Sequence, residues 1–173
     1  MPITEIRLER CTLRSWRRTD KPDLVRFANN RKIWRNLTHL FPHPYTEADA
    51  DFWVSLASNA APSVHFAIEM DGMAIGGVGL AAQEGIFSGT ADFGYWLAEP
   101  YWGRGIATEV ARAMVTHAFT ALAFERLEAP VFEWNPASMR VLEKVGFVRE
   151  GVLRRSAFKD GQFIDRVMYA ITR

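Results

Sequence analysis

Residues 95–108, YWLAEPYWGRGIAT, constrain the fold most strongly, because they join an apolar strand end to the start of a long helix. Pro100 marks a turn, and Gly103 and Gly105 stand two residues apart just before the helix. A helix start has backbone N–H groups without partners and the positive end of the peptide dipole. Glycines let a ligand approach those groups with no Cβ in the way. The stretch therefore predicts a phosphate-bearing ligand between strand and helix; glycines that serve only packing are the alternative.

The length and composition predict one globular domain over residues 1–173. Of these residues 49% are hydrophobic, and a chain of this size buries about 70% of its unfolded surface. No apolar run approaches the roughly 18 residues of a membrane span, and no signal-peptide pattern is present, so no membrane association is expected. Cys11 is the single cysteine; it predicts no disulfide and no metal site, and it fits a cytoplasmic protein. The net charge of +1 gives no case for nucleic acid as a partner.

Charge is unevenly distributed along the chain. Residues 1–36 hold ten Lys/Arg and four Asp/Glu, whereas residues 37–103 hold eight acids and no Lys or Arg. One interpretation is an acidic region that attracts a cationic acceptor, beside a basic region that receives an anionic cofactor. The other is that this segregation disappears when the chain folds.

The hydrophobic periodicity predicts a mixed α/β domain. Asp71-Gly72 predicts a tight hairpin, and Gly76, Gly77 and Gly79 in its second strand predict a bulge or a close backbone neighbour. The expected strands are 6–16, 64–70, 73–81, 89–97, 126–134, 148–158 and 163–171.

Four helices are expected, and three of them carry recognisable start signals. One begins at Pro22; another is capped by Thr46 with Asp49 and is expected to bury Phe52, Trp53 and Leu56. A long helix covers 104–122, with Glu109 as a structural salt bridge or cap and His117 in the core. The last runs from Asn135 at its N-cap to Gly146 at its end.

Two segments taken together identify a family. They read WGRGIATE at 102–109 and NPASMRVLEKVGF at 135–147, about one strand and one helix apart. This pairing resembles the GNAT superfamily of acyl-CoA-dependent N-acetyltransferases, in particular its ribosomal-protein (RimJ/RimL-like) branch. The sequence FPHPYTEADADFW, from Phe41, resembles that branch's acceptor-side loop and second helix. The resemblance covers nearly the whole chain; it implies a mostly antiparallel sheet of six or seven strands, splayed in the middle, with about four helices.

The resemblance implies acetyl-CoA as the cofactor. The family pattern Gln/Arg-x-x-Gly-x-Gly/Ala is matched at Gly105 and Ala107, whereas Trp102 stands where the family has Gln or Arg. Backbone amides carry most of this site, so the change at Trp102 leaves the expected pyrophosphate site in place. The residues implied at the coenzyme are Tyr95, Trp96 and Leu97 on the splayed strand, Trp102, Gly103, Arg104, Gly105, Ile106, Ala107 and Thr108 in the loop and helix, and Asn135, Ser138, Arg140 and Lys144.

Several of these residues have structural alternatives. Asn135 and Ser138 are expected near the thioester through the family motif, but on physical grounds Asn135 also caps its helix. Arg140 and Lys144 share one helix face; they either meet the outer phosphates or form a solvent-exposed face with Glu143.

The implied reaction is direct attack of a neutral primary amine on the thioester. Asp92 matches a position where this branch commonly has glutamate and is the candidate base through a water relay, while Ser138 is the candidate acid for the leaving thiolate. A backbone N–H near residues 95–97 is expected to stabilise the oxyanion.

The acceptor is expected to be a protein or peptide N-terminal α-amine, with Phe41, His43 and Tyr45 lining its pocket. A small amine such as an antibiotic or polyamine is the alternative within the class. A non-catalytic acyl-CoA-binding module is the alternative outside it. A homodimer is left open.

Overall fold

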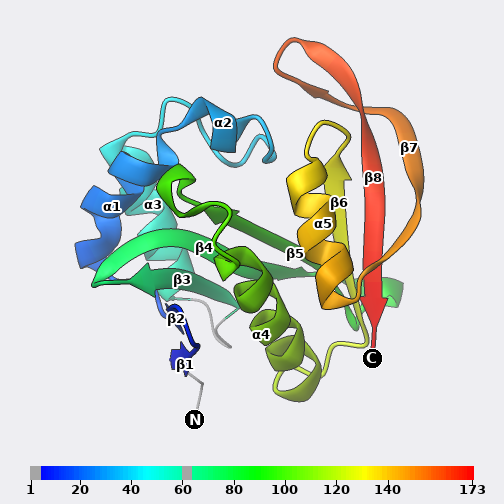
Figure 1. Ribbon diagram of the computed structural model, residues 1–173, viewed down its shortest axis with the longest axis horizontal. Helices are drawn as coiled ribbons and strands as arrows, with labels where there is room; N and C mark the ends of the chain where they lie inside the picture. The colour runs from blue at the N-terminus through cyan, green and yellow to red at the C-terminus, as the bar shows by residue number, and fades with distance from the viewer. Residues whose placement is uncertain (1–4, 60–63) are drawn as a thin grey trace.

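The computed structural model describes residues 5–59 and 64–173, whose strands form a single mixed sheet with helices on both faces (Figure 1). The strand order is β1-β2-β3-β4-β5-β6-β8-β7, and every neighbouring pair except β5 and β6 is antiparallel. The strands are β1 (Glu5–Arg7), β2 (Thr12–Arg14), β3 (His65–Met70), β4 (Met73–Ala82), β5 (Thr90–Leu97), β6 (Arg126–Phe132), β7 (Val148–Lys159) and β8 (Gln162–Thr172). The helices are α1 (Lys21–Ala28), α2 (Arg31–Trp34), α3 (Glu47–Ser58), α4 (Ile106–Thr120) and α5 (Pro136–Val145), with short 3-10 turns η1 (Arg18–Asp20), η2 (Gly85–Phe87) and η3 (Glu99–Tyr101).

The single strand expected over residues 6–16 is wrong. The chain turns back between β1 and β2, where the Leu8 N–H donates to the Cys11 carbonyl at 2.9 Å, and the two strands pair antiparallel. The Glu109 carboxylate of α4 accepts the N–H of Glu9 and of Arg10 in this turn. This long-range contact fixes the turn, and the described sheet therefore has eight strands, where six or seven were expected.

The hairpin expected at Asp71-Gly72 joins β3 to β4, and both residues have positive φ, 52° and 78°. The bulge expected in β4 is also confirmed. Ile68 pairs with Gly76 but Glu69 pairs with Ala74, so Ile75 is an extra residue in β4. A bulge increases local twist and bends its strand.

The capping box at the start of α3 is confirmed, because the Thr46 side chain accepts from the Asp49 N–H and the Asp49 carboxylate accepts from the Thr46 N–H. The expected apolar face of this helix is confirmed at Trp53, which is half-buried and packs against the smaller core, and is wrong at Phe52 and Leu56. Phe52 and Leu56 are 69% and 49% exposed. The small side chains of Ala50, Val54 and Ala57 face the sheet instead, because Trp16 and Tyr45 already fill the space beneath α3.

Two hydrophobic cores lie on opposite faces of the sheet. The larger is formed by α4, α5 and the sheet; the smaller lies under α1 and α3. The most fully buried large side chains are Phe66, Leu13, Leu24, Ile68, Ile75, Leu80, Ile106, Met114, Leu127, Leu142, Ile164 and Val110.

The parallel strands β5 and β6 part soon after they meet. They share only three paired positions, ending at Asp92 and Glu128, yet β5 continues to Leu97 and β6 to Phe132. Figure 1 shows the two strands diverging, with α4 and α5 on the viewer's side of the sheet and on either side of the gap. This parting is the splay that the family resemblance implied, and it opens one edge of the β5 backbone.

We expect Gly76→Ala to lower the free energy of unfolding by about 1–3 kcal/mol, because an added side chain in a packed site forces the backbone to move. A Cβ at Gly76 lies 2.4 Å from the Trp96 carbonyl oxygen of β5 and 3.2 Å from the Leu97 Cα. Urea unfolding of the variant measures the effect. Gly151→Ala is the control, because nothing lies within 4 Å of its Cβ; equal stabilities of the two variants would contradict the close approach of β4 and β5.

Candidate functional site

The loop between η3 and α4 presents unpaired backbone amides. Gly103 and Gly105 have φ of 73° and 78°, and no side chain caps the start of α4. The Glu109 N–H donates to the Gly105 carbonyl at 3.1 Å, so the amides of the preceding turn have no acceptor within the helix. Nothing lies within 4 Å of a Cβ built at either glycine. These amides face open space at the positive end of a 15-residue helix, an arrangement suited to an anion.

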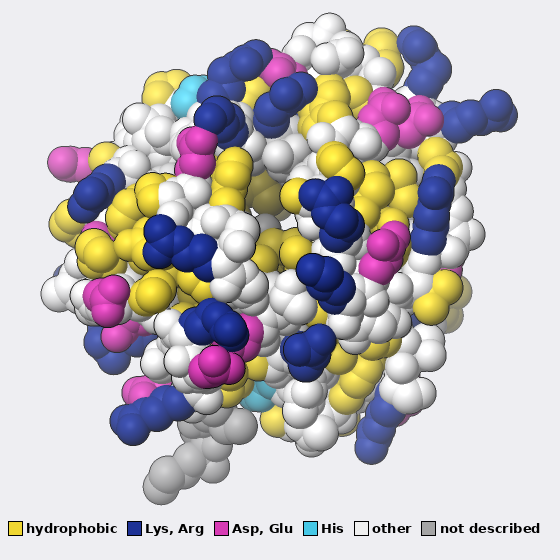
Figure 2. All heavy atoms as spheres, in the orientation of Figure 1, with side chains coloured by type: hydrophobic (Ala, Val, Ile, Leu, Met, Phe, Trp, Pro, Cys, Tyr) yellow, Lys and Arg dark blue, Asp and Glu magenta, His cyan; other side chains and the backbone are white. Residues whose placement is uncertain are grey.

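A hollow of about 320 Å³ lies beside this helix start. Figure 2 shows Lys and Arg side chains gathered on the face of the molecule that carries α4 and α5. The Arg112 guanidinium donates to the Lys144 carbonyl at 3.1 Å, which ties α4 to the end of α5. Two basic residues here, Arg10 and Arg112, were not predicted. The residues lining the hollow are Glu9, Arg10, Gly105, Thr108, Glu109, Arg112 and Lys144.

The sequence contains a signal for Arg112 but none for Arg10. Arg112 follows Thr108 by one helical turn and therefore shares its face. Arg10 reaches the hollow only because the β1–β2 turn docks on α4. Arg140, which was predicted at the outer phosphates, is exposed on α5.

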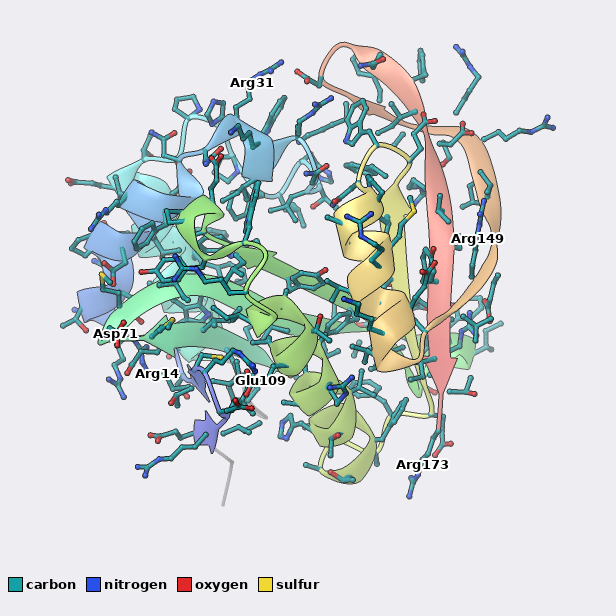
Figure 3. All side chains as sticks on the ribbon, in the orientation of Figure 1. Arg14, Arg31, Asp71, Glu109, Arg149 and Arg173 are labelled. Atoms are coloured by element: carbon teal, nitrogen blue, oxygen red, sulfur yellow. The ribbon has the colours of Figure 1, made fainter. Side chains whose placement is uncertain are left out.

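Glu109 has the structural role expected of it. Its carboxylate accepts the Glu9 N–H at 2.5 Å and the Arg10 N–H at 3.3 Å, and it forms an ion pair with the Arg10 guanidinium. Figure 3 labels Glu109 on α4 beside the β1–β2 turn. Burial, together with the Glu109 charge, raises the pKa of the Cys11 thiol to about 11, so this cysteine stays protonated at neutral pH.

The backbone of β5 faces the splay at alternate residues. The Ala98 N–H donates to the Ile75 carbonyl of β4, and the Leu97 carbonyl accepts the indole N–H of Trp102 at 2.6 Å on the other side. Because the backbone polar groups of a strand alternate in direction, the N–H groups of Leu97 and Tyr95 point toward the gap. Trp102 thus ties the strand end to the glycine loop.

Tyr95 and Ser138 meet across the splay. The Tyr95 hydroxyl lies 3.0 Å from the Ser138 Oγ, and the Ser138 N–H donates to the Asn135 side chain at 3.3 Å. Burial raises the pKa of Tyr95, and the Ser138 hydrogen bond offsets part of that effect, so the phenol is neutral at neutral pH. Asn135 is therefore a helix cap, and Ser138 and Tyr95 place two hydroxyl groups where β5 faces α5.

Asp92 lies apart from this hydroxyl pair. It is exposed, three residues before Tyr95 and on the opposite face of β5. At about 3.3 Å per residue this is roughly 10 Å along the strand. The Gln83 amide donates to both Asp92 and Glu128, each at 3.2 Å. Asp92 therefore has no direct contact with the Tyr95–Ser138 pair.

The three residues predicted at the acceptor occupy different environments. Phe41 contacts Trp96 with ring centroids 5.7 Å apart, and His43 lies on Trp34 at the same separation. Tyr45 is only 5% exposed, belongs to the smaller core, and has its pKa raised by burial. Phe41 and Trp96 thus pack beside the smaller core, on the face opposite α4 and α5, whereas His43 lies against α2.

The acidic run of residues 37–103 is partly neutralised in the fold, because three of its eight acids form ion pairs with bases from residues 1–36. Asp51 pairs with Lys21, Glu69 with Arg14, and Glu99 with Lys32, while Asp49 caps α3. Of the two interpretations of the charge distribution, the structure favours the one in which segregation disappears on folding.

Residues 5–59 and 64–173 contain neither a membrane-spanning helix nor a metal-binding cluster. No helix there is long and apolar enough to cross a membrane. No group of three or more His, Cys, Asp or Glu side chains there is arranged to hold a metal ion.

Comparison with known proteins gives consistent matches. The family model described as acetyltransferase (GNAT) domain matches residues 10–148. The uncharacterized N-acetyltransferase YokL of a Bacillus subtilis (strain 168) prophage is 39% identical over 83 residues, which is 47% of each chain. The alignment thus spans about half the length of this curated relative. Spermidine N(1)-acetyltransferase of Escherichia coli (strain K12) is 27% identical over 92% of this chain and 84% of its own. The structure of Mycobacterium smegmatis RimJ in complex with CoA-disulfide has a TM-score of 0.84 and 29% identity, covering 99% of this chain and 88% of that one.

Proposed function

The chain belongs to the acetyltransferase (GNAT) family, and we propose that it transfers an acetyl group from acetyl-CoA to the α-amine of a protein or peptide N-terminus. One observation carries the proposal: the open amides at Gly103 and Gly105 and the Tyr95–Ser138 hydroxyl pair lie along the same splayed edge. An anion site at one end and proton donors at the other suit a phosphate-bearing thioester.

The phosphate end of acetyl-CoA is assigned to the start of α4. The backbone amides of residues 103–108 bind the pyrophosphate, and the hollow lined by Arg10, Arg112 and Lys144 receives the remaining phosphate. When bound, acetyl-CoA supplies the activated acyl thioester. The inward N–H groups of Tyr95 and Leu97 then stabilise negative charge on the carbonyl oxygen.

Ser138 acts as the proton donor to the departing thiolate and is reprotonated by water, which returns the proton that the amine loses, and Tyr95 orients Ser138. The buried phenol of Tyr95 stays protonated. Either hydroxyl can donate in its 3.0 Å contact with the Ser138 Oγ, and in this proposal Tyr95 is the donor. The serine hydroxyl hydrogen is then free to point at the sulfur. Because Tyr95 acts through Ser138, we describe it as a positioning residue.

The acceptor α-amine needs little help from a base. An α-amine with a pKa of about 8 is roughly one-tenth neutral at pH 7, whereas a lysine with a pKa of about 10.4 is under one part in a thousand. The exposed Asp92 takes up the proton through water, since it does not reach the hydroxyl pair directly. Phe41, His43 and Trp96 form the approach for the amine, and Tyr45 supports them from the core.

Thiol release from acetyl-CoA, measured with a panel of amines, tests the proposed function. The panel contains a serine-initiated peptide, the same peptide with an acetylated N-terminus, spermidine and free lysine. We expect rapid release with the free peptide and none with the blocked one, and mass spectrometry should find one acetyl group on the N-terminal residue. Tight acetyl-CoA binding without acceptor-dependent release would instead identify a non-catalytic binding module.

We expect Gly105→Val to weaken coenzyme A binding at least 100-fold in calorimetry. The new side chain occupies the open space in front of the helix amides, at a φ of 78° that a β-branched residue rarely adopts. Gly72→Val is the matched control, because it has the same φ and open surroundings but lies in the β3–β4 turn. If both variants bind coenzyme A like the parent protein, the assignment of the cradle is wrong.

We expect Ser138→Ala to lower kcat about 100-fold while the affinity for coenzyme A changes less than threefold, because general acids contribute about 10²–10⁴-fold to rate. The cap by Asn135 uses the Ser138 backbone N–H and survives the substitution. Tyr95→Phe should lower kcat by a smaller factor and add little to Ser138→Ala in the double variant. Fully additive effects would show that the two hydroxyl groups act independently.

A further inference from the structure

A four-residue helix, α2, crosses the end of the splay at which β5 and β6 have parted. On one side, the Asn30 side chain and the Lys32 ammonium bind Glu99 of η3, which follows β5. On the other side, the Arg35 guanidinium lies 4.3 Å from the ring centroid of Trp134, which follows β6. The helix thus connects the two diverging strand ends.

The tip of the β7–β8 hairpin completes this connection. The Asp160 carboxylate forms ion pairs with the guanidinium groups of Arg31, at 2.5 Å, and of Arg35, at 3.6 Å. Lys159 lies 3.9 Å from the ring centroid of Trp34 and is only 8% exposed. Figure 1 shows the hairpin tip leaning over the open end of the splay toward α2, and Figure 3 labels Arg31 there. We call Arg31, Lys32, Trp34, Arg35, Trp134, Lys159 and Asp160, together with Glu99, the α2 bridge.

The α2 bridge adjoins the acceptor residues. Trp34 contacts His43 on the acceptor loop and carries the Lys159 ammonium on its ring. Since the other end of the splay is closed by β5–β6 pairing as far as Asp92, and α4 and α5 cover one face, an amine that reaches Ser138 passes beside the bridge.

The charge of the α2 bridge is positive. It holds four cationic side chains, Arg31, Lys32, Arg35 and Lys159, and two carboxylates, Glu99 and Asp160, for a net charge of +2. Both carboxylates are already engaged with these cations. Among the described residues, Lys159 has no ion-pair partner, and burial lowers its pKa. The α2 bridge would therefore repel a second positive charge on an acceptor and attract a carboxylate on it.

From this geometry we propose that the α2 bridge selects the acceptor by charge: it favours an N-terminal peptide with acidic residues close behind its α-amine and disfavours polyamines and basic peptides. This inference rests on the proposed transfer to an α-amine and specifies the class of peptide. Ion pairing within the bridge leaves a net charge of +2 beside the acceptor loop, and the proposal gives that net charge a role.

Three serine-initiated peptides of equal length test the proposal, with Glu-Glu, Gln-Gln or Lys-Lys at positions three and four. For the parent protein we expect kcat/KM to decrease in that order, with at least a 10-fold ratio between the acidic and basic peptides. The ratio should fall as ionic strength rises, because salt screens exposed charges over about 8–10 Å at 0.10–0.15 M. Equal rates for the three peptides, a preference for the basic one, or a preference for spermidine would overturn the proposal.

Variants locate the effect. Lys32→Glu changes a side chain that is 66% exposed and should bring the acidic-to-basic ratio close to one; Arg35→Gln should lower it by a smaller factor. Arg149→Gln is the control, since this exposed arginine lies near the start of β7, far along the hairpin from its tip (Figure 3), and should leave the ratio unchanged. An unchanged ratio in both bridge variants would also contradict the proposal.

The outcome is distinguishable from failure of the proposed function. If no peptide is acetylated although acetyl-CoA binds, acetyl transfer to an α-amine is wrong. Fluorescence anisotropy of the labelled peptides then tests the bridge by itself. Tighter binding of the acidic peptide, weakened by Lys32→Glu, would support charge selection by the bridge, and equal binding of all three would contradict it.

Discussion

The structure depends on the parting of β5 and β6 after only three paired positions. Two parallel strands that stop pairing leave backbone N–H and C=O groups that must find other partners or face a ligand. Here the Leu97 carbonyl is satisfied by the Trp102 indole, while the neighbouring N–H groups of Tyr95 and Leu97 face the gap. The bulge at Ile75 bends β4, and β4 and β5 approach closely at Gly76 beside this opening. A long ligand is thus expected to lie along the edge of β5 that β6 leaves unpaired.

The open sheet needs support from outside its own hydrogen bonds, and that support comes from distant parts of the chain. Glu109 ties the first hairpin to α4, Arg112 ties α4 to α5, and the α2 bridge joins the two strand ends. These contacts combine hydrogen bonds, ion pairs and ring contacts across long sequence separations. The charged side chains of the α2 bridge that stabilise the opening also determine the charge beside it. Structural support and the proposed selection of the acceptor therefore depend on the same residues.

Local signals in the sequence predicted much of this fold. The capping box at Thr46, the Asp71-Gly72 turn and the glycines of β4 each specify a backbone geometry through nearest neighbours, and each is confirmed. The glycine loop before α4 and the Asn135 cap were also identifiable, because helix starts have strong residue preferences. The predictions were wrong where tertiary contacts, and not local sequence, determine the burial of a side chain or the end of a strand. Phe52 and Leu56 are exposed because aromatic residues from other segments fill the space beneath α3, and the first strand is broken by contacts with Glu109. Arg10 and the α2 bridge could not be predicted, since they depend on loops meeting only in the folded chain.

The central claim is that one ligand runs from the start of α4 to the Tyr95–Ser138 pair along the open edge of β5. Titration of the isotope-labelled protein with coenzyme A, followed by amide NMR, tests it most directly. The account predicts saturable shift changes of the amides of residues 103–108 together with those of Tyr95, Leu97 and Ser138, all with one dissociation constant. Changes confined to the start of α4, with the amides of Tyr95 and Leu97 unaffected at saturation, would contradict it.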